Sequence, residues 1–181
     1  MILKLYKYGE KVLRIKANPV PIVTDAQRKL AIDMVETMHH ARGVGLAAEQ
    51  VGRTEQLCVI DVPADCDTEE DAAFNAVIPM PLLLWNPQIL SCDGSVRDQE
   101  GCLSFPGIGG SIVRAAQVTV QYLDSDNHAQ IITARGYLAR ALQHEIDHLN
   151  GILYVDHMTA VERLAVASKL KKLAAANGGT R

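Results

Sequence analysis

Apolar residues recur at spacings of three and four in three stretches of the chain, which is the pattern of amphipathic helices. Each stretch follows a threonine that can cap a helix, and we expect helices over residues 24–42, 133–150 and 159–176. In the middle helix this cap is Thr133. The predicted apolar stripe of the last helix consists of Leu164, Leu170 and Leu173.

Shorter apolar runs predict strands over residues 56–62, 82–90 and 117–124. A polar SDN turn leads from the third of these runs into AQIITA, so a hairpin is expected there. Residues 64–81 are acidic and then bounded by proline, which indicates a surface insertion. These elements predict an α+β fold. Antiparallel β-sheets should pack around the middle helix, with one further helix near each end of the chain.

Length and composition set the broad class. The chain of 181 residues is expected to form a single domain, residues 1–181, whose core needs no disulfide. A net charge of -3 shows no basic signature for nucleic acid, and no apolar run approaches the ~20 residues that span a membrane. The first residues lack a secretory signal. The cysteines show no disulfide spacing, so we interpret Cys58, Cys66 and Cys92 as structural and expect a reducing cytoplasm.

The most informative stretch is HEIDH, near the end of the middle helix. Its two histidines are four residues apart, so they lie about 40° apart around the helix axis and both can reach one metal ion. Glu145 lies beside them, where it can accept a proton from water. The same helix stripe holds Tyr137, Ala141, His144 and His148, which suits a half-apolar pocket. A bare HExxH pentad also occurs by chance, with histidines that simply face water.

A third metal ligand is needed, and the residues after the pentad are poor candidates. The metzincin pattern requires a histidine where this chain has Tyr154. Glu162 suits a thermolysin-like site but belongs to a predicted capping box with Thr159, and His157 has no motif around it. Upstream, Cys102 lies in EGCLSFP, a turn bounded by Gly, Ser and Pro where a thiolate can point at a metal.

The chain contains, in this order, GVGLAAEQVG at residues 43–52, EGCLSFP at 100–106 and QHEIDHL at 143–149. Together they closely resemble the signature motifs of the peptide deformylases, and the likeness extends from VLRIKANPV near the start to YVDHM after the pentad. The resemblance implies a cytoplasmic, metal-dependent hydrolase of protein biosynthesis. Such an enzyme removes the formyl group from N-formylmethionine on nascent peptides, and it is expected to act at the ribosome.

The resemblance also implies a ligand set and a general base. Cys102, His144 and His148 would hold one divalent metal per chain and leave a fourth position open. Glu145 would take a proton from the attacking water and deliver it to the departing amine. Fe(II) is the metal that the resemblance favours, with Ni, Co or Zn as substitutes. Ligand chemistry alone favours zinc.

Further roles follow for residues that would contact the substrate. The resemblance assigns oxyanion donors to the Gln50 side chain and the Leu103 backbone N–H, and a hydrogen bond to the peptide backbone to Gly45. Arg140 is expected on the rim or in a salt bridge. The walls expected for the methionine pocket are Val44, Tyr137 and Ala141.

Two departures from the family pattern stand out. Glu49 occupies a position that usually carries proline, which changes the charge beside the oxyanion donor. Gly109-Gly110 stand where many bacterial members carry a longer or basic side chain. Arg114 matches the family, and we expect it to pair with Glu100.

Two other functional classes fit part of the pattern. A metallopeptidase would need a third ligand after the pentad, and Tyr154 disfavours the commonest version. A metal-stabilised binding module without turnover would normally close the site with a fourth protein ligand. Such a module would not need Glu145 or Gln50.

Overall fold

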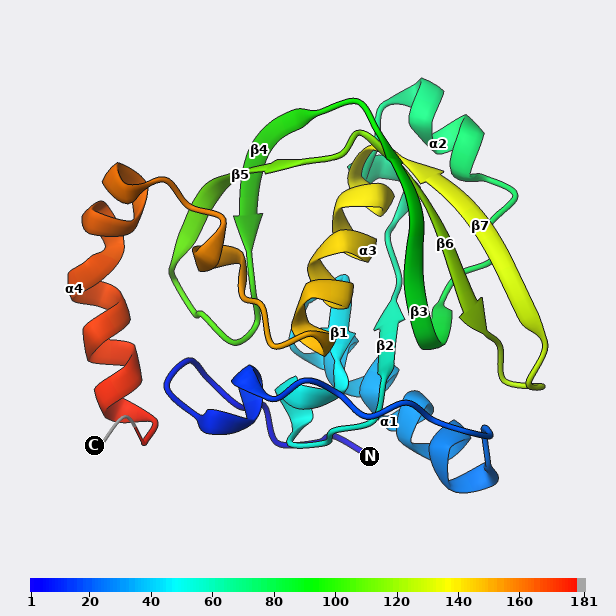
Figure 1. Ribbon diagram of the computed structural model, residues 1–181, viewed down its shortest axis with the longest axis horizontal. Coiled ribbons are helices and arrows are strands. Elements are labelled where there is room, and N and C mark those ends of the chain that lie inside the picture. Colours follow the sequence, from blue (N-terminus) through cyan, green and yellow to red (C-terminus); the bar gives the residue numbers. More distant parts are fainter. Residues whose placement is uncertain (179–181) are drawn as a thin grey trace.

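The computed structural model describes residues 1–178, in which five consecutive strands separate the first two α-helices from the last two (Figure 1). Residues 179–181, which the sequence prediction included in the single domain, lie outside this range. The α-helices are α1 (Asp25–His40), α2 (Glu69–Asn75), α3 (Gly136–Leu149) and α4 (Ala160–Ala176). The strands are β1 (Gly45–Ala47), β2 (Leu57–Ile60), β3 (Leu82–Asp93), β4 (Val96–Gly101), β5 (Gly109–Arg114), β6 (Gln117–Leu123) and β7 (Ala129–Arg135). Short 3-10 helices are η1 (Lys11–Arg14), η2 (Ala48–Val51), η3 (Ala64–Cys66) and η4 (Tyr154–Asp156).

All strand pairs in these sheets are antiparallel. The larger sheet has the order β1-β2-β3-β6-β7, and β4 pairs with β5 in a separate two-stranded sheet. The predicted strands correspond to β2, β3 and β6, and the expected hairpin is formed by β6 and β7. The α+β class is therefore confirmed. Strand β1 is an edge strand, a position that matters for the site.

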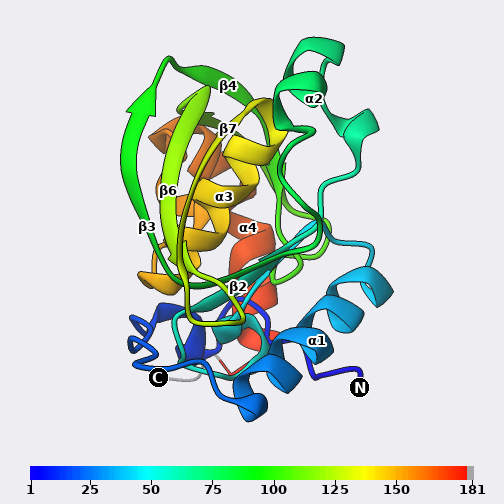
Figure 2. The same cartoon turned by 90° about the vertical axis from the view of Figure 1, so that its right-hand side faces the viewer.

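Helix α3 lies at the centre of the molecule, against the inner face of the curved larger sheet (Figure 2). Its apolar arc includes Leu138 and Leu142, which pack with Val118 and Val120 of β6 in one core cluster. Burying a side chain of this size contributes about 1.5–3 kcal/mol, so several such contacts hold the helix firmly. The opposite face carries the pentad and is buried too, rather than facing water.

The start of α3 corrects the sequence prediction. Thr133 does not cap the helix but lies in β7, where its hydroxyl is 3.0 Å from that of Thr119 in β6. The strand continues to Arg135, and Gly136 then adopts a φ of +58°, which turns the chain into the helix. Pairing with β6 outweighed the capping preference of a threonine.

The last helix is confirmed in position and only partly in its packing. Thr159 caps α4, and Glu162 completes the predicted capping box by accepting from the Thr159 backbone N–H at 2.8 Å. Leu170 is buried, but Leu164 is 77% exposed, so the predicted stripe is wrong at that position. No helix within residues 1–178 is long and apolar enough to cross a membrane.

The sequence did not predict strand β1, the β4-β5 sheet, the helices inside the insertion or the place of Cys92 in a strand. The β4-β5 sheet gives no alternating apolar pattern, because VRDQEG and GGSIVR carry few apolar residues and most of their positions are exposed. The insertion at residues 64–81 contains η3 and α2. Cys92 lies beyond the strand predicted over residues 82–90 but is an exposed residue of β3, which extends to Asp93.

Candidate active site

The two histidines of the pentad meet a cysteine from another element. His144 and His148 lie on the last turns of α3, with ring centroids 5.0 Å apart. Cys102 follows the end of β4, and its Sγ lies 3.3 Å from His148 Nε2. One donor atom from each of the three side chains lies within 4.8 Å of the others. Strand β4 and helix α3 thus bring the predicted ligand set together.

The chemistry of this donor set fits a transition-metal ion. A thiolate with two imidazoles binds Fe, Co, Ni or Zn in preference to Mg or Ca. Burial lowers the pKa of His148 well below its ordinary value, so this imidazole is neutral, the form that coordinates a metal. The downstream alternatives are engaged elsewhere: the Tyr154 hydroxyl donates to the Ile108 carbonyl at 2.9 Å, and Glu162 caps α4.

A buried ionic network orients His144. Its Nδ1 lies 3.1 Å from Glu100, which in turn accepts two hydrogen bonds from Arg114, at 2.9 and 3.1 Å, as expected from the sequence. Arg140 also donates to Glu100, at 3.1 Å. Burial raises the pKa of Glu100, but hydrogen bonds from His144 and Arg114 outweigh burial and bring it to about 2. A permanently ionised Glu100 therefore fixes the ring of His144.

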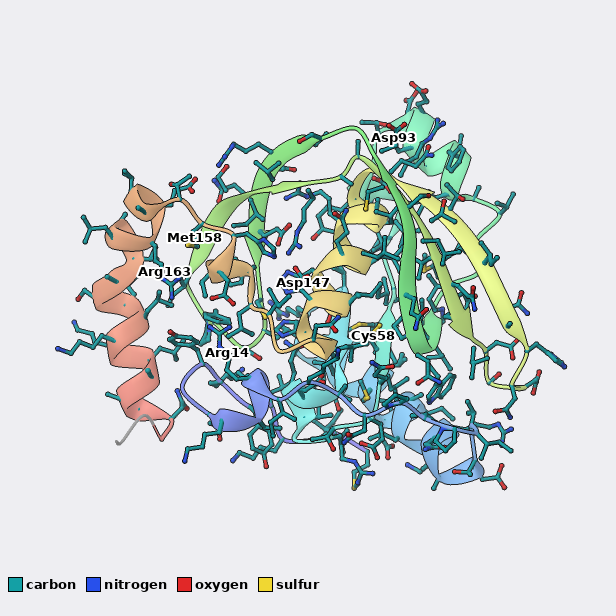
Figure 3. The ribbon with its side chains drawn as sticks, viewed as in Figure 1. Arg14, Cys58, Asp93, Asp147, Met158 and Arg163 are labelled. Carbon is teal, nitrogen blue, oxygen red and sulfur yellow. The ribbon has the colours of Figure 1, made fainter. Side chains whose placement is uncertain are left out.

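The network continues towards the surface on the far side of Arg114. Arg114 also forms an ion pair with Asp147, one residue before His148. The Asp147 carboxylate lies 2.7 Å from His157 Nε2. His157 is therefore a partner of Asp147 and not a ligand of the three-residue group. Figure 3 shows Asp147 near the end of α3 that faces the following loop.

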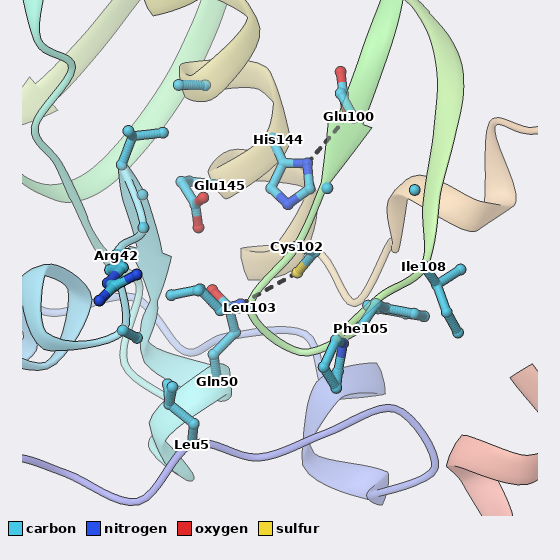
Figure 4. Close-up of a pocket in the computed structure, with 18 of the residues that line it drawn as sticks. Leu5, Arg42, Gln50, Glu100, Cys102, Leu103, Phe105, Ile108, His144 and Glu145 are labelled. Carbon is cyan, nitrogen blue, oxygen red and sulfur yellow. Dashed lines mark hydrogen bonds and ion pairs between the residues drawn. The ribbon is translucent and has the colours of Figure 1, made fainter. Parts of the chain in front are cut away.

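The Glu145 carboxylate points into the cavity beside Cys102 and Leu103 (Figure 4). The residue is 4% exposed, and its Oε2 has no partner among the described residues. Burial raises its pKa to about 7. Gly45 lies directly against this carboxylate, and a Cβ there would collide with it. A glycine at position 45 is what allows β1 and Glu145 to approach so closely.

The Gln50 side chain is held in one orientation by two sets of contacts. Its Oε1 accepts from the Ala47 backbone N–H at 2.8 Å, which fixes the amide group. Its Nε2 then lies 3.4 Å from Cys102 Sγ and 3.2 Å from Ser104 Oγ. The carbonyl of the adjoining Leu103 accepts from Lys7 Nζ at 2.6 Å. Both predicted oxyanion donors are therefore held next to the cysteine turn.

These groups surround a cavity of about 650 Å³. It is also lined by Arg140, which the sequence placed on the rim or in a salt bridge and which is both buried and ion-paired. His148 lies behind the lining and is 1% exposed. Lys7 and Arg42 line the cavity without having been predicted, because neither belongs to a motif near the cysteine or the pentad. The predicted residues that line it are Val44, Gly45, Gln50, Cys102, Leu103, Tyr137, Ala141, His144 and Glu145.

Glu49, the unusual acid beside Gln50, is fully buried, and neither carboxylate oxygen has a hydrogen-bond partner among the described residues. Burial raises its pKa to about 8. The carboxyl of the unfolded chain ionises near its ordinary value of 4.5, whereas the folded protein retains the proton up to about pH 8. The folded state then binds more protons, so Glu49 makes the free energy of unfolding fall as pH rises between these values.

We therefore expect Glu49→Met to remove the part of the pH dependence of the unfolding free energy that Glu49 causes. The free energy of unfolding of the variant, relative to that of the parent, should increase by roughly 3–5 kcal/mol as the pH rises from 5 to 8. Urea unfolding at several pH values measures it, with Glu70→Gln as a control that removes an exposed acid on α2. Equal pH slopes for parent and Glu49→Met would mean that Glu49 is ionised in the folded protein.

Comparisons with known proteins agree on one family. The family model described as polypeptide deformylase matches residues 2–164. The chain is 43% identical to the peptide deformylase of Halothermothrix orenii, over 88% of this chain and 96% of that protein. It is 41% identical to that of Pelotomaculum thermopropionicum, over 90% and 96%. The crystal structure of peptide deformylase from Thermus thermophilus superposes with a TM-score of 0.84 at 34% identity, covering 97% of this chain and 99% of that one. The Ehrlichia chaffeensis enzyme in complex with actinonin also gives 0.84, at 39% identity, covering 94% and 96%.

Proposed function

The chain belongs to the peptide deformylase family, and on that premise we propose that it hydrolyses the formyl amide of N-formylmethionine at the start of newly synthesised polypeptides. The observation that carries this proposal is the group of Cys102, His144 and His148, of which Cys102 and His144 line the cavity that Glu145 also lines. We propose that the enzyme acts on nascent chains at the ribosome, in the cytoplasm. We treat residues 1–181 as one catalytic domain.

We propose Fe(II) as the resident metal, one per chain, with Ni, Co or Zn as substitutes. Cys102, His144 and His148 would hold it. A metal ion in such a site acts as a Lewis acid and makes water a nucleophile near neutral pH. The soft thiolate and the two imidazoles support this group of metals and do not distinguish among its members.

Glu145 handles the proton in this mechanism. Its carboxylate faces the cavity beside the ligand set, so it can take a proton from the attacking water. It then delivers that proton to the amine that leaves as the formyl C–N bond breaks. The Gln50 Nε2 and the Leu103 backbone N–H stabilise the negative charge on the formyl oxygen.

The edge strand β1 offers a backbone partner for the substrate. It pairs with β2 on one side only, and Val44 and Gly45 line the cavity. An extended peptide can therefore add to this edge, with Gly45 as a hydrogen-bonding residue. The methionine side chain would then lie between Val44 and the α3 residues Tyr137 and Ala141.

Release of formate from formyl-Met-Ala-Ser tests the proposal. We expect turnover of the formylated peptide and none of the acetylated or unformylated peptide. Cleavage of an internal peptide bond would instead identify a metallopeptidase. Stoichiometric metal without turnover of any peptide would identify a metal-stabilised binding module.

Gln50→Ala tests the oxyanion assignment. Loss of one preorganised donor should lower kcat by about 10²–10³-fold. Metal content should stay near that of the parent, because Gln50 is not a member of the ligand group. Formyl-peptide kinetics and metal assay on one preparation measure both, with Gln121→Ala on an exposed position of β6 as control. Unchanged kcat in Gln50→Ala would remove this residue from the mechanism.

A further inference from the structure

A second cavity, of about 520 Å³, adjoins the first and has no role in the proposed chemistry. Residues of α3 and β4, which run in the same direction in Figure 1, line both cavities, and the 64–81 insertion also lines the second. The second cavity is lined by the first residues of each element, such as Gly136 and Val96. The first is lined by later residues, such as His144 and Glu100. The two cavities therefore lie one after the other along these two elements.

Tyr137 and Arg140 line both cavities, so they form the boundary between them. Arg140 is 6% exposed and cannot swing aside without breaking several contacts. Its guanidinium donates to the carbonyls of Val96 at 3.2 Å and Asp98 at 3.1 Å, and to Glu100 at 3.1 Å. This side chain ties α3 to β4 and makes a fixed part of the boundary.

Tyr137 forms the other part of the boundary and is held differently. Its ring is half-buried against the apolar cluster around α3, and within residues 1–178 its hydroxyl makes no hydrogen bond. Its backbone N–H, in contrast, donates to Asp67 of the 64–81 insertion. The position of the ring is thus set by where the backbone is held, rather than by a bond to the side chain.

The insertion clamps the chain just before Tyr137. Asn75, which is 8% exposed, accepts from the Arg135 backbone N–H at 3.1 Å and donates to the Arg135 carbonyl at 3.1 Å. It also donates to Asp67 at 3.0 Å, which orients the acceptor of the Tyr137 N–H. Gly136 has a φ of +58°, and any side chain there would collide with the Asp67 carboxylate.

We propose that Tyr137, positioned by the Asp67–Asn75 clamp, closes the side-chain pocket against the second cavity and so limits the length of the first residue's side chain. The proposal rests on the proposed function. With Arg140 fixed, the ring of Tyr137 is the element that ends the pocket. The enzyme accepts methionine and rejects longer unbranched side chains, and it does so because the phenol ring occupies the space that they would need.

The test compares kcat/KM of the metal-loaded enzyme for two peptides. One is formyl-Met-Ala-Ser, and the other carries 2-aminodecanoic acid in place of Met, with an unbranched side chain about twice as long. Each methylene that becomes buried contributes about fourfold. We expect the parent to prefer Met, and Tyr137→Ala to raise the relative kcat/KM of the longer peptide by at least about tenfold. Tyr137→Leu should give part of this shift, and Tyr137→Phe, which keeps the ring, should retain the parent ratio.

The role of the Asp67–Asn75 clamp is tested by the same ratio of kcat/KM values. Asn75→Ala should shift the ratio in the same direction as Tyr137→Ala, and Glu70→Gln, elsewhere on α2, should not. A role in folding alone would lower both peptides together and leave the ratio unchanged. The proposed role of Tyr137 is excluded if the parent hydrolyses both peptides with equal kcat/KM, or if Tyr137→Ala and Tyr137→Leu keep the parent ratio. A parent that does not hydrolyse formyl-Met-Ala-Ser would instead overturn the proposed function, and the proposed role of Tyr137 with it.

Discussion

Glu145→Gln should lower the turnover of formyl peptides by about 10²–10⁴-fold, the loss typical of a missing general acid–base. The substitution keeps the shape of the side chain and some of its hydrogen bonding, but an amide cannot accept the proton of the attacking water. Metal content should stay near the parent value, because Glu145 is not a member of the Cys102, His144 and His148 group. Metal assay and kinetics on the same preparation distinguish loss of chemistry from loss of metal.

The position of Glu145 makes this result specific. It is 4% exposed on α3 and presses against Gly45, so a change of size rather than charge would disturb β1 as well. Glu162→Gln is the matched control, because it makes the same chemical change at the α4 cap, outside the cavity. Loss of metal from Glu145→Gln would make Glu145 a ligand or a fold determinant. Near-parent kcat would assign the base to another group.

The pentad could be read from the sequence because helical spacing alone places two histidines on one face. The order of the three motifs then connected Cys102 with that helix across about forty residues of sequence. What brings them together physically is β4, whose few apolar residues left no periodic signal. The strand was missed although its last residues position both Cys102 and Glu100.

Other errors came from competition between local and long-range interactions. Thr133 is a good helix cap in isolation, but pairing of β7 with β6 included it in the sheet. A salt bridge of Arg140 was expected, but its bond to the Val96 carbonyl and that of Lys7 to the Leu103 carbonyl join residues far apart in the sequence, and no local pattern signals them. The insertion at residues 64–81 was correctly placed at the surface. Its hold on the start of α3 requires Asn75 and Arg135 to meet, which spacing does not indicate.

Cys102→Ala should empty the metal site and abolish activity together. A three-residue site that loses its thiolate keeps two imidazoles, which are too few to retain a catalytic metal against dilution and washing. We expect about one metal per chain in protein purified without oxygen and less than about a tenth of that in Cys102→Ala, measured by elemental analysis. Cys92→Ala, which removes an exposed thiol of β3, should retain the parent metal content and activity.

Variants of Tyr154 and Glu162, the alternative third ligands after the pentad, test the opposite assignment. Tyr154→Phe removes a hydroxyl that donates to Ile108, and Glu162→Ala removes a helix cap, so both should reduce stability modestly and leave the metal in place. Thermal unfolding of each variant shows whether it remains folded when its metal is measured. If Cys102→Ala kept its metal and activity while Tyr154→Phe or Glu162→Ala lost them, the third ligand would lie after the pentad. The site would then be that of a metallopeptidase, and the assignment of deformylase activity would be wrong.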